Sequence, residues 1–172
     1  MYSTMRTIKR IFHYLAHLEW TERVQHTCIF CNRENLVKIV YEDDDLIAVE
    51  NRRLSGRYHW LIMPKAHKIR DIEALDGNDL PLLQEMDRVK HHLIALHSTP
   101  ATPRPSIISG YHRGRRPLLG KIYYPDIVSI HHLHLHVIVQ PHVVPRLLKY
   151  PAWLPLMWKS DARVMREVRR LV

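Results

Sequence analysis

Three histidines alternate with aliphatic residues in residues 132–138, which read His-Leu-His-Leu-His-Val-Ile. Successive side chains of a β-strand point to opposite faces, so His132, His134 and His136 are expected to share one face while the aliphatic residues point into the core. Imidazole nitrogens bind transition metals, and a neutral imidazole is also a nucleophile toward phosphorus. The motif therefore predicts either a metal site or a phosphate-handling site.

The spacing of these histidines bears on that choice. Residues i, i+2 and i+4 of a flat strand span about 13 Å, whereas the ligands of a three-histidine catalytic zinc site converge on one point. This geometry favours separate roles for the three imidazoles over joint ligation of one ion, and spacing alone leaves both chemistries open.

A pair of cysteines forms a second candidate site. Cys28 and Cys31 are the two cysteines of the chain, spaced as Cys-x-x-Cys. Such a pair is a redox centre, half of a metal site or two buried small apolar residues. A redox pair requires a thioredoxin-like βαβ context, which the surrounding sequence does not show, and tetrahedral zinc requires two further ligands. A metal site and unmetallated buried cysteines both remain open.

Hydrophobic patterning predicts the elements that position these residues. Short strands are expected at residues 36–41, 46–50, 58–63 and 107–111, and a longer strand at residues 129–139. In residues 79–97 apolar side chains recur at every third or fourth position, which indicates an amphipathic helix. Strands that meet in hairpins around one long helix predict an α+β fold with an antiparallel sheet of about five strands.

The length and composition indicate one domain with two extensions. We expect an amphipathic helical extension in residues 1–27, the domain itself in residues 28–142, and a basic tail with aromatic residues and prolines in residues 143–172. Two cysteines exclude a disulfide-stapled secreted scaffold, and no apolar run is long enough to span a membrane. The expected location is intracellular, in the cytoplasm or nucleus, with a mitochondrial presequence at residues 1–18 as the weaker alternative.

Positive charge is concentrated in two segments of the chain. The sequence has 26 basic and 17 acidic side chains, a formal net charge of +9. Residues 104–121 contain five basic and no acidic side chains, and residues 142–172 contain seven basic and two acidic ones. Such clusters attract phosphates on nucleotides, nucleic acids or acidic membranes, with a solvated charged surface as the alternative.

Five segments of the domain match the motifs of one known family. They are residues 28–31 (Cys-Ile-Phe-Cys), 40–50, 59–67 (ending in Pro-Lys-Ala-His), 110–112 (Gly-Tyr-His) and 129–138. On these motifs residues 28–142 resemble the histidine-triad (HIT) superfamily of nucleotide hydrolases and transferases. Within it they are most similar to the branch that holds the third-type Hint adenosine phosphoramidases and aprataxin.

The resemblance implies a role for each histidine of the motif. His134 is the expected nucleophile, which attacks the α-phosphorus and forms a nucleotidyl-histidine. His136 is expected to hydrogen-bond the phosphate oxygens, and His132 to orient the nucleophile. His59, on the neighbouring strand, is expected to support the same phosphate.

The resemblance also implies which residues bind the nucleotide and a metal. Asn51 and Ser129 join His136 in the expected nucleotide-binding set. Asn51 stands where the family usually has an acidic residue for the ribose hydroxyls, and Ser129 is expected near the leaving group. Some relatives hold zinc through the cysteine pair, the Pro-Lys-x-His histidine and the first triad histidine. The implied ligands of a structural Zn²⁺ are Cys28, Cys31, His67 and His132, and no organic cofactor is expected.

The resemblance favours a nucleotide hydrolase that cleaves a bond at the α-phosphorus of an adenosine 5′-phosphoramidate or acyl-adenylate and releases AMP. Its partner is then a purine nucleotide conjugate, and we expect a homodimer that joins two sheets. One alternative is an aprataxin-like deadenylase that acts on adenylated nucleic-acid ends, with the basic loop at residues 113–121 and the tail as contacts. The other is a nucleotide-binding or interaction module with little turnover.

Residues 113–127 form an insertion between the Gly-Tyr-His motif and the histidine strand, where relatives have only a few residues. Because the insertion leads directly into the strand that carries the expected nucleophile, we expect it to border the site. Arg113, Arg115 and Arg116 are then candidates to contact a phosphate or an extended substrate.

Overall fold

A computed structural model describes residues 28–36, 38–97, 106–119 and 122–172 of the protein. The predicted amphipathic extension at residues 1–27 lies outside the described residues. Within the described part, no helix is long and apolar enough to cross a bilayer.

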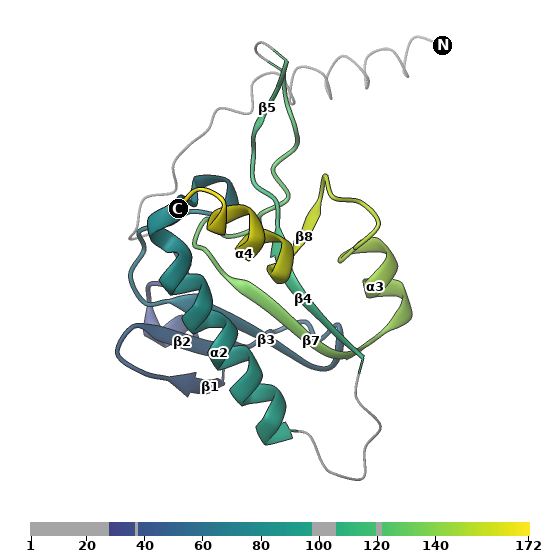
Figure 1. The fold of residues 1–172 in the computed structure, drawn as a ribbon. Helices are drawn as coiled ribbons and strands as arrows, with labels where there is room; N and C mark the ends of the chain where they lie inside the picture. Colours follow the sequence, from purple (N-terminus) through teal and green to yellow (C-terminus); the bar gives the residue numbers. More distant parts are fainter. Residues whose placement is uncertain (1–27, 37, 98–105, 120–121) are drawn as a thin grey trace.

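An antiparallel sheet of six strands forms the centre of the molecule, in the order β1-β2-β3-β7-β4-β8 (Figure 1). Its strands are β1 (Ile39–Glu42), β2 (Leu46–Glu50), β3 (Gly56–Pro64), β7 (Leu135–Pro141), β4 (Ile107–His112) and β8 (Trp158–Ser160). The prediction of an α+β fold with an antiparallel sheet is confirmed, and the tail adds one strand to the five expected.

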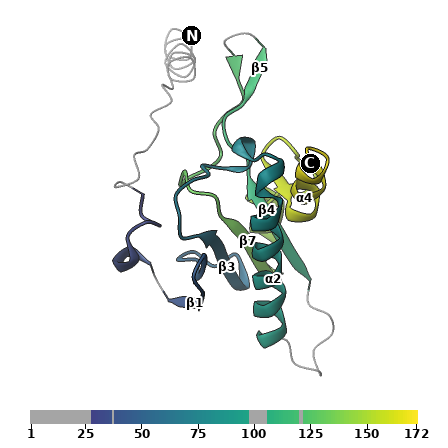
Figure 2. The ribbon, with the colours of Figure 1, turned by 60° about the vertical axis from the view of Figure 1, so that its left-hand side comes forward.

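Helix α2 (Leu80–His97) covers one face of this sheet (Figures 1 and 2). The described residues also form the short 3-10 helices η2 (Arg33–Asn35), η3 (Ile72–Ala74) and η4 (Gly77–Asp79). The buried side of α2 packs on alternate strand residues, which include Trp60, Ile62, Leu135 and Val137. Because side chains alternate along a strand, the intervening residues His59, Leu61 and His136 lie on the opposite face.

The C-terminal tail is part of the same core. After α3 (Val143–Leu148) the chain forms β8, which pairs with β4, and then α4 (Asp161–Arg169), which packs beside α2. A buried ion pair, with 2.6 Å between Lys90 Nζ and Asp161 Oδ2, joins the two helices. Gly110 allows the close approach of β8, because a Cβ atom there would lie 2.3 Å from the carbonyl oxygen of Lys159.

The insertion forms a separate two-stranded hairpin of β5 (Pro117–Leu119) and β6 (Ile122–Tyr123). Figures 1 and 2 both show it projecting away from the six-stranded sheet. Its stem is held by arginine–aromatic contacts, with the Arg115 guanidinium 4.0 Å from the Tyr123 ring centroid and the Arg116 guanidinium 4.3 Å from that of Tyr124.

The predicted strand at residues 129–139 is wrong at its first half, because β7 begins only at Leu135. The preceding segment turns instead: the His132 N–H donates to the Ile130 carbonyl, and the Leu133 N–H donates to the Ile69 carbonyl, each at 2.9 Å. These bonds satisfy the backbone without a neighbouring strand. His132 and His134 therefore lie in a turn that leads into the strand, although Leu133 and Leu135 still point into the core.

Candidate active site

His134 lies directly before β7 and is held in one tautomer by the main chain. Its Nδ1 is 2.6 Å from the carbonyl oxygen of His132. A carbonyl can only accept a hydrogen bond, so Nδ1 carries the proton and Nε2 keeps a lone pair. Burial lowers the pKa of His134 below its usual value, which favours the neutral form. The ring is thus prepared as a nitrogen nucleophile.

His136 and His59 form a buried pair on adjacent strands. His136 is on β7, His59 is on β3, and the distance between His59 Nε2 and His136 Nδ1 is 3.0 Å. Burial lowers the pKa of His59 to about 4 and that of His136 well below its usual range. Both rings are therefore neutral at physiological pH.

A cavity of about 590 Å³ opens beside these histidines. Its apolar end includes Phe30, Leu36, Val49 and Leu61, which belong to one hydrophobic cluster. Polar groups come from Asn51, Ser129, His134 and His136, and the cavity is also lined by His112, Leu148, Lys149 and Met157. Phe30 contacts the edge of the His134 ring, with 5.3 Å between ring centroids. A pocket of this size with one apolar end and convergent polar groups suits a nucleotide-sized ligand.

Asn51 and Ser129 both line the cavity, as expected of nucleotide-binding residues. Ser129 is exposed, whereas Asn51 is half-buried and its side chain already has partners. Asn51 Nδ2 is 3.2 Å from His59 Nε2, and Asn51 Oδ1 accepts a hydrogen bond from the Arg53 N–H at 3.1 Å. One amide hydrogen and one lone pair of Asn51 remain for a ligand.

Three aromatic side chains that were not predicted as site residues, His112, Tyr150 and Trp158, pack against the His136 ring. The His136 ring centroid is 5.0 Å from that of His112, 5.5 Å from Tyr150 and 5.8 Å from Trp158. Burial lowers the pKa of His112 to about 3. His112 could have been found from its Gly-Tyr-His motif, whereas Tyr150 and Trp158 come from the tail and no local pattern links them to the site.

Of the basic side chains that the structure describes in the insertion, Arg113, Arg115 and Arg116 do not line the cavity. Arg113 forms a double hydrogen-bonded ion pair with Glu73, at 2.7 and 2.9 Å, and donates to the Pro155 carbonyl at 3.1 Å. Arg116 donates to the Leu156 carbonyl at 3.0 Å. The expectation that these arginines contact the substrate directly is therefore not met in this structure. They hold the tail segment that precedes Met157, a residue of the cavity wall.

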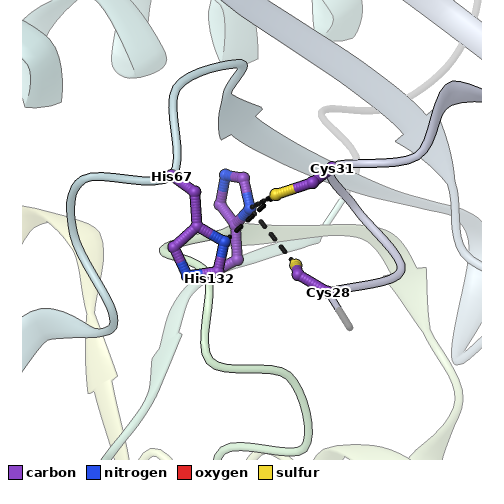
Figure 3. Close-up of side chains that lie close together, drawn as sticks. All are labelled: Cys28, Cys31, His67 and His132. Atoms are coloured by element: carbon purple, nitrogen blue, oxygen red, sulfur yellow. Dashed lines mark hydrogen bonds between the residues drawn. The ribbon is translucent and has the colours of Figure 1, made fainter. Parts of the chain in front are cut away.

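The four residues of the implied metal site come together at one point (Figure 3). The ligand atoms of Cys28, Cys31, His67 and His132 all lie within 4.8 Å of one another. The loop of the cysteine pair supplies two donors, the turn after β3 supplies His67, and the turn before β7 supplies His132. The cluster has the donor types and the closeness that a metal ion requires.

The hydrogen bonds of His132 fit such a site. Its Nε2 is 2.7 Å from the Pro64 carbonyl and must donate, so Nδ1 is the nitrogen with a lone pair. That Nδ1 lies 3.6 Å from the Cys28 sulfur and 3.7 Å from the Cys31 sulfur, and His67 Nδ1 lies 3.1 Å from the Cys31 sulfur. A carbonyl that accepts from the other ring nitrogen of a histidine ligand, and so fixes its tautomer, is typical of metal sites.

A family comparison agrees with this geometry. The family described as "Scavenger mRNA decapping enzyme C-term binding" matches residues 25–149, which is more than half of the chain. The chain therefore belongs to this family within the histidine-triad superfamily, whose members include nucleotide hydrolases, and the resemblance drawn from its motifs is confirmed.

Three individual relatives are between 25% and 31% identical to this chain. The chain is 31% identical over 114 residues to aprataxin of Danio rerio, a match that covers 66% of this chain and 30% of that protein. It is 28% identical over 127 residues to "Adenosine 5'-monophosphoramidase HINT3" of Xenopus tropicalis, covering 72% and 74% of the two chains. It is 25% identical over 142 residues to "Bifunctional adenosine 5'-phosphosulfate phosphorylase/adenylylsulfatase HINT4" of Arabidopsis thaliana, covering 80% and 82%. The chain thus spans less than a third of the aprataxin relative.

Solved structures share the fold. A histidine triad protein from Clostridium difficile superposes with a TM-score of 0.52 at 21% identity, covering 72% of this chain and 96% of that one. A HIT family hydrolase from Clostridium thermocellum superposes with a TM-score of 0.50 at 19% identity, covering 74% and 99%.

Proposed function

We propose that this protein hydrolyses an adenosine 5′-phosphoramidate or acyl-adenylate at the α-phosphorus and releases AMP. The observation that carries the proposal is the tautomer of His134, whose Nδ1–H donates to the His132 carbonyl at 2.6 Å while its Nε2 keeps the lone pair that attacks phosphorus. The position of His134 on a nucleotide-sized cavity supports the same role. The relative HINT3 is described as an adenosine 5′-monophosphoramidase, and most of its length is matched.

The proposed reaction has two displacements at phosphorus. In the first, the His134 Nε2 lone pair bonds to the α-phosphorus while the bond to the leaving group breaks. The leaving group departs with that electron pair, and ammonia is completed by one proton from solvent. In the second, a water oxygen bonds to phosphorus, the phosphorus–nitrogen bond returns its electron pair to His134, and one proton is released with AMP. The His132 carbonyl stabilises the positive charge on the nucleotidyl-histidine through the Nδ1–H.

The other expected residues have proposed places around this centre. We propose that the apolar end of the cavity takes the purine base, and that Asn51 and Ser129 bind the ribose and the leaving-group side. His136, which lines the cavity, is proposed to hydrogen-bond the phosphate region, and the buried His59 is proposed to support it through the 3.0 Å contact with His136 Nδ1. Lys149, which also lines the cavity, supplies positive charge, and this charge matters because the neighbouring histidines are neutral.

We further propose that Cys28, Cys31, His67 and His132 hold a structural Zn²⁺. The donor set fits tetrahedral zinc, and the lone pair of His132 Nδ1 is available to it. When bound, the ion supplies a rigid cross-link between the cysteine loop and the two turns rather than a reacting group. Thiolate ligands require a reducing environment, which favours the cytoplasm or nucleus as the compartment.

A deadenylase acting on adenylated nucleic-acid ends is the second candidate. The observations that favour it are the 31% identity to aprataxin and the cationic Lys149 at the cavity wall. A nucleotide-binding module with little turnover is the third candidate.

The homodimer also stays a proposal, which light scattering after size-exclusion chromatography tests. Among the described residues β8 occupies the outer side of β4, so the free edges at which two such sheets could join are those of β1 and the three-residue β8.

One assay separates the three candidates. The protein is incubated with adenosine 5′-phosphoramidate and, separately, with 5′-adenylated DNA, and AMP release is measured. We expect turnover of the phosphoramidate and a loss of at least about 1,000-fold in His134→Ala. His91→Ala is the matched control, because the His91 side chain is exposed and remote from the cavity, and it should retain full activity. Release from DNA alone would support the deadenylase, and AMP binding without turnover would support the module.

A further inference from the structure

The carboxylate of Asp126 accepts three hydrogen bonds at the end of the insertion. Its Oδ2 is 2.9 Å from Arg70 Nη2 and 2.9 Å from His131 Nε2, and its Oδ1 accepts from the Val128 N–H at 3.2 Å. A carboxylate can only accept, so all three groups donate to it. The side chains of Asp126, Arg70 and His131 are each at most 20% exposed, so solvent and salt screen these contacts little.

Residues 69–73 anchor both ends of the insertion. At its end, Arg70 binds Asp126. At its start, Gly114 packs directly on the Asp71 carboxylate, and the contact leaves no room for a Cβ atom at position 114. Arg70 joins the two ends, because its Nη1 is also 2.8 Å from Asp71 Oδ2. The hairpin that projects from the sheet in Figures 1 and 2 therefore has its base fixed on one short segment.

The same segment holds the turn that carries the triad. The Ile69 carbonyl accepts a hydrogen bond from the Leu133 N–H at 2.9 Å. His131, the second side chain bound to Asp126, directly precedes His132 in this turn. The end of the insertion and the turn before β7 are thus joined through one carboxylate.

The bond between Asp126 and His131 closes residues 126–131 into a loop beside the cavity. These residues belong to no helix or strand, so their position depends on individual contacts such as this one. The members of the loop that line the cavity are Ile127, Ser129 and Ile130. A change at Asp126 should therefore move part of the cavity wall.

We propose that Asp126 is a positioning residue that holds this loop as the leaving-group wall of the site and so determines which leaving groups are accepted. The proposal rests on the proposed function, in which Ser129 lies on the leaving-group side. Ammonia is too small to need such a wall, whereas a bulky amine is oriented by contact with it. A displaced wall should therefore slow the release of bulky amines selectively, because a small misplacement of reacting groups is costly.

The kinetic test compares two leaving groups in the full-length protein. We measure kcat/KM for adenosine 5′-phosphoramidate, which releases ammonia, and for its N-benzyl derivative, which releases benzylamine. In Asp126→Ala the ratio of the N-benzyl value to the parent value should fall about tenfold or more. His131→Phe removes one of the three donors and should change the ratio in the same direction. Asp44→Ala, at an exposed acid between β1 and β2, is the matched control and should keep the wild-type ratio.

Hydrogen exchange followed by mass spectrometry examines the same loop without substrate. Peptides that cover residues 127–133 should exchange faster in Asp126→Ala than in the wild type, because the Val128 N–H loses its acceptor and the loop is no longer closed. Peptides from β3 and α2 should exchange as in the wild type.

A constant kinetic ratio in Asp126→Ala would overturn the proposal, because a smaller folded fraction lowers both kcat/KM values equally and cancels in the ratio. Unchanged exchange at residues 127–133, or an equal acceleration throughout the protein, would overturn it as well. A wild type that released no AMP from either substrate would refute the proposed function, and the exchange measurement would still decide whether Asp126 holds the loop.

Discussion

His132 Nε2 donates a 2.7 Å hydrogen bond to the carbonyl oxygen of Pro64, and this contact links the two sites of the protein. It turns the other nitrogen of His132 toward the cysteines, while the main-chain carbonyl of the same residue accepts the proton of His134 at 2.6 Å. The side chain of His132 thus belongs to the cysteine–histidine cluster that we propose holds zinc, and its backbone carbonyl orients the proposed nucleophile. A change in the cluster should therefore also change the orientation of His134.

Removal of the metal is the first prediction. We expect the purified wild type to contain about one zinc per chain by elemental analysis. Cys31→Ser should lose the metal and lower both the melting temperature and kcat, because the turn that carries His132 loses its cross-link. A metal-free wild type, or a Cys31→Ser variant that keeps its zinc, would contradict the assignment.

The buried ion pair between Lys90 and Asp161 gives the second prediction. Both side chains are nearly inaccessible, and the pair joins α2 to α4. Lys90→Met leaves the Asp161 carboxylate buried without its cation, so the free energy of unfolding should fall by about 3–5 kcal/mol in urea titrations. Arg163→Gln removes the partly exposed pair with Glu167, which keeps Lys159 as its other partner, and as a control should cost about 1 kcal/mol or less. Equal losses in the two variants would count against a structural role for the pair.

Acid should destabilise the protein through its buried histidines. Burial lowers the pKa of His59 to about 4 and that of His112 to about 3, below the unfolded value near 6.5. The folded state therefore favours the neutral rings, and their stabilisation is complete above about pH 6.5 and is lost as the pH falls toward 4 and 3. From pH 6.5 to pH 4 the protonation of each ring should lower the free energy of unfolding by on the order of 3 kcal/mol.

Equilibrium urea titrations between pH 7 and pH 4 measure this effect. His112→Phe keeps an aromatic ring against Tyr150 and Trp158 but cannot titrate, so its stability should depend less on pH than that of the wild type. A wild-type stability that is constant from pH 7 to pH 4 would show that these rings are not buried in the neutral form.

Arg113 supplies the fourth prediction. Its guanidinium holds Glu73 and the Pro155 carbonyl, so Arg113→Ala should release the segment before Met157 and lower the free energy of unfolding by about 1–3 kcal/mol. Arg115→Ala changes a guanidinium of the projecting hairpin and should have a smaller effect on stability. If Arg113→Ala raised KM with no change in stability, direct contact with the substrate would be supported instead.

The sequence alone identified the elements whose patterns are local. Strand β2 was predicted at residues 46–50 and is observed there, and the predicted helix at residues 79–97 is observed at 80–97. Apolar residues that recur every second position share one face of a strand, and those that recur every third or fourth position share one face of a helix. The pattern of burial therefore specifies the element. The same holds for Leu133 and Leu135, which are buried as predicted.

The metal cluster could also be inferred from sequence, but only through the family resemblance. Nothing local relates Cys28 to His132, which are separated by more than 100 residues. Their meeting depends on how the turns after β3 and before β7 fold together.

Only the tertiary structure determines how the tail packs and which ring nitrogen of each site histidine carries the proton. Strand β8 has three residues and forms because β4 offers an unpaired edge and Gly110 lets it approach. The backbone before His134 turns because Ile69 accepts its hydrogen bond. The tautomers of His132 and His134 follow from two backbone carbonyl groups, those of Pro64 and of His132 itself, which the fold brings to the ring nitrogens. Residue type fixes what an imidazole can do, and only its neighbours in space determine which nitrogen does it.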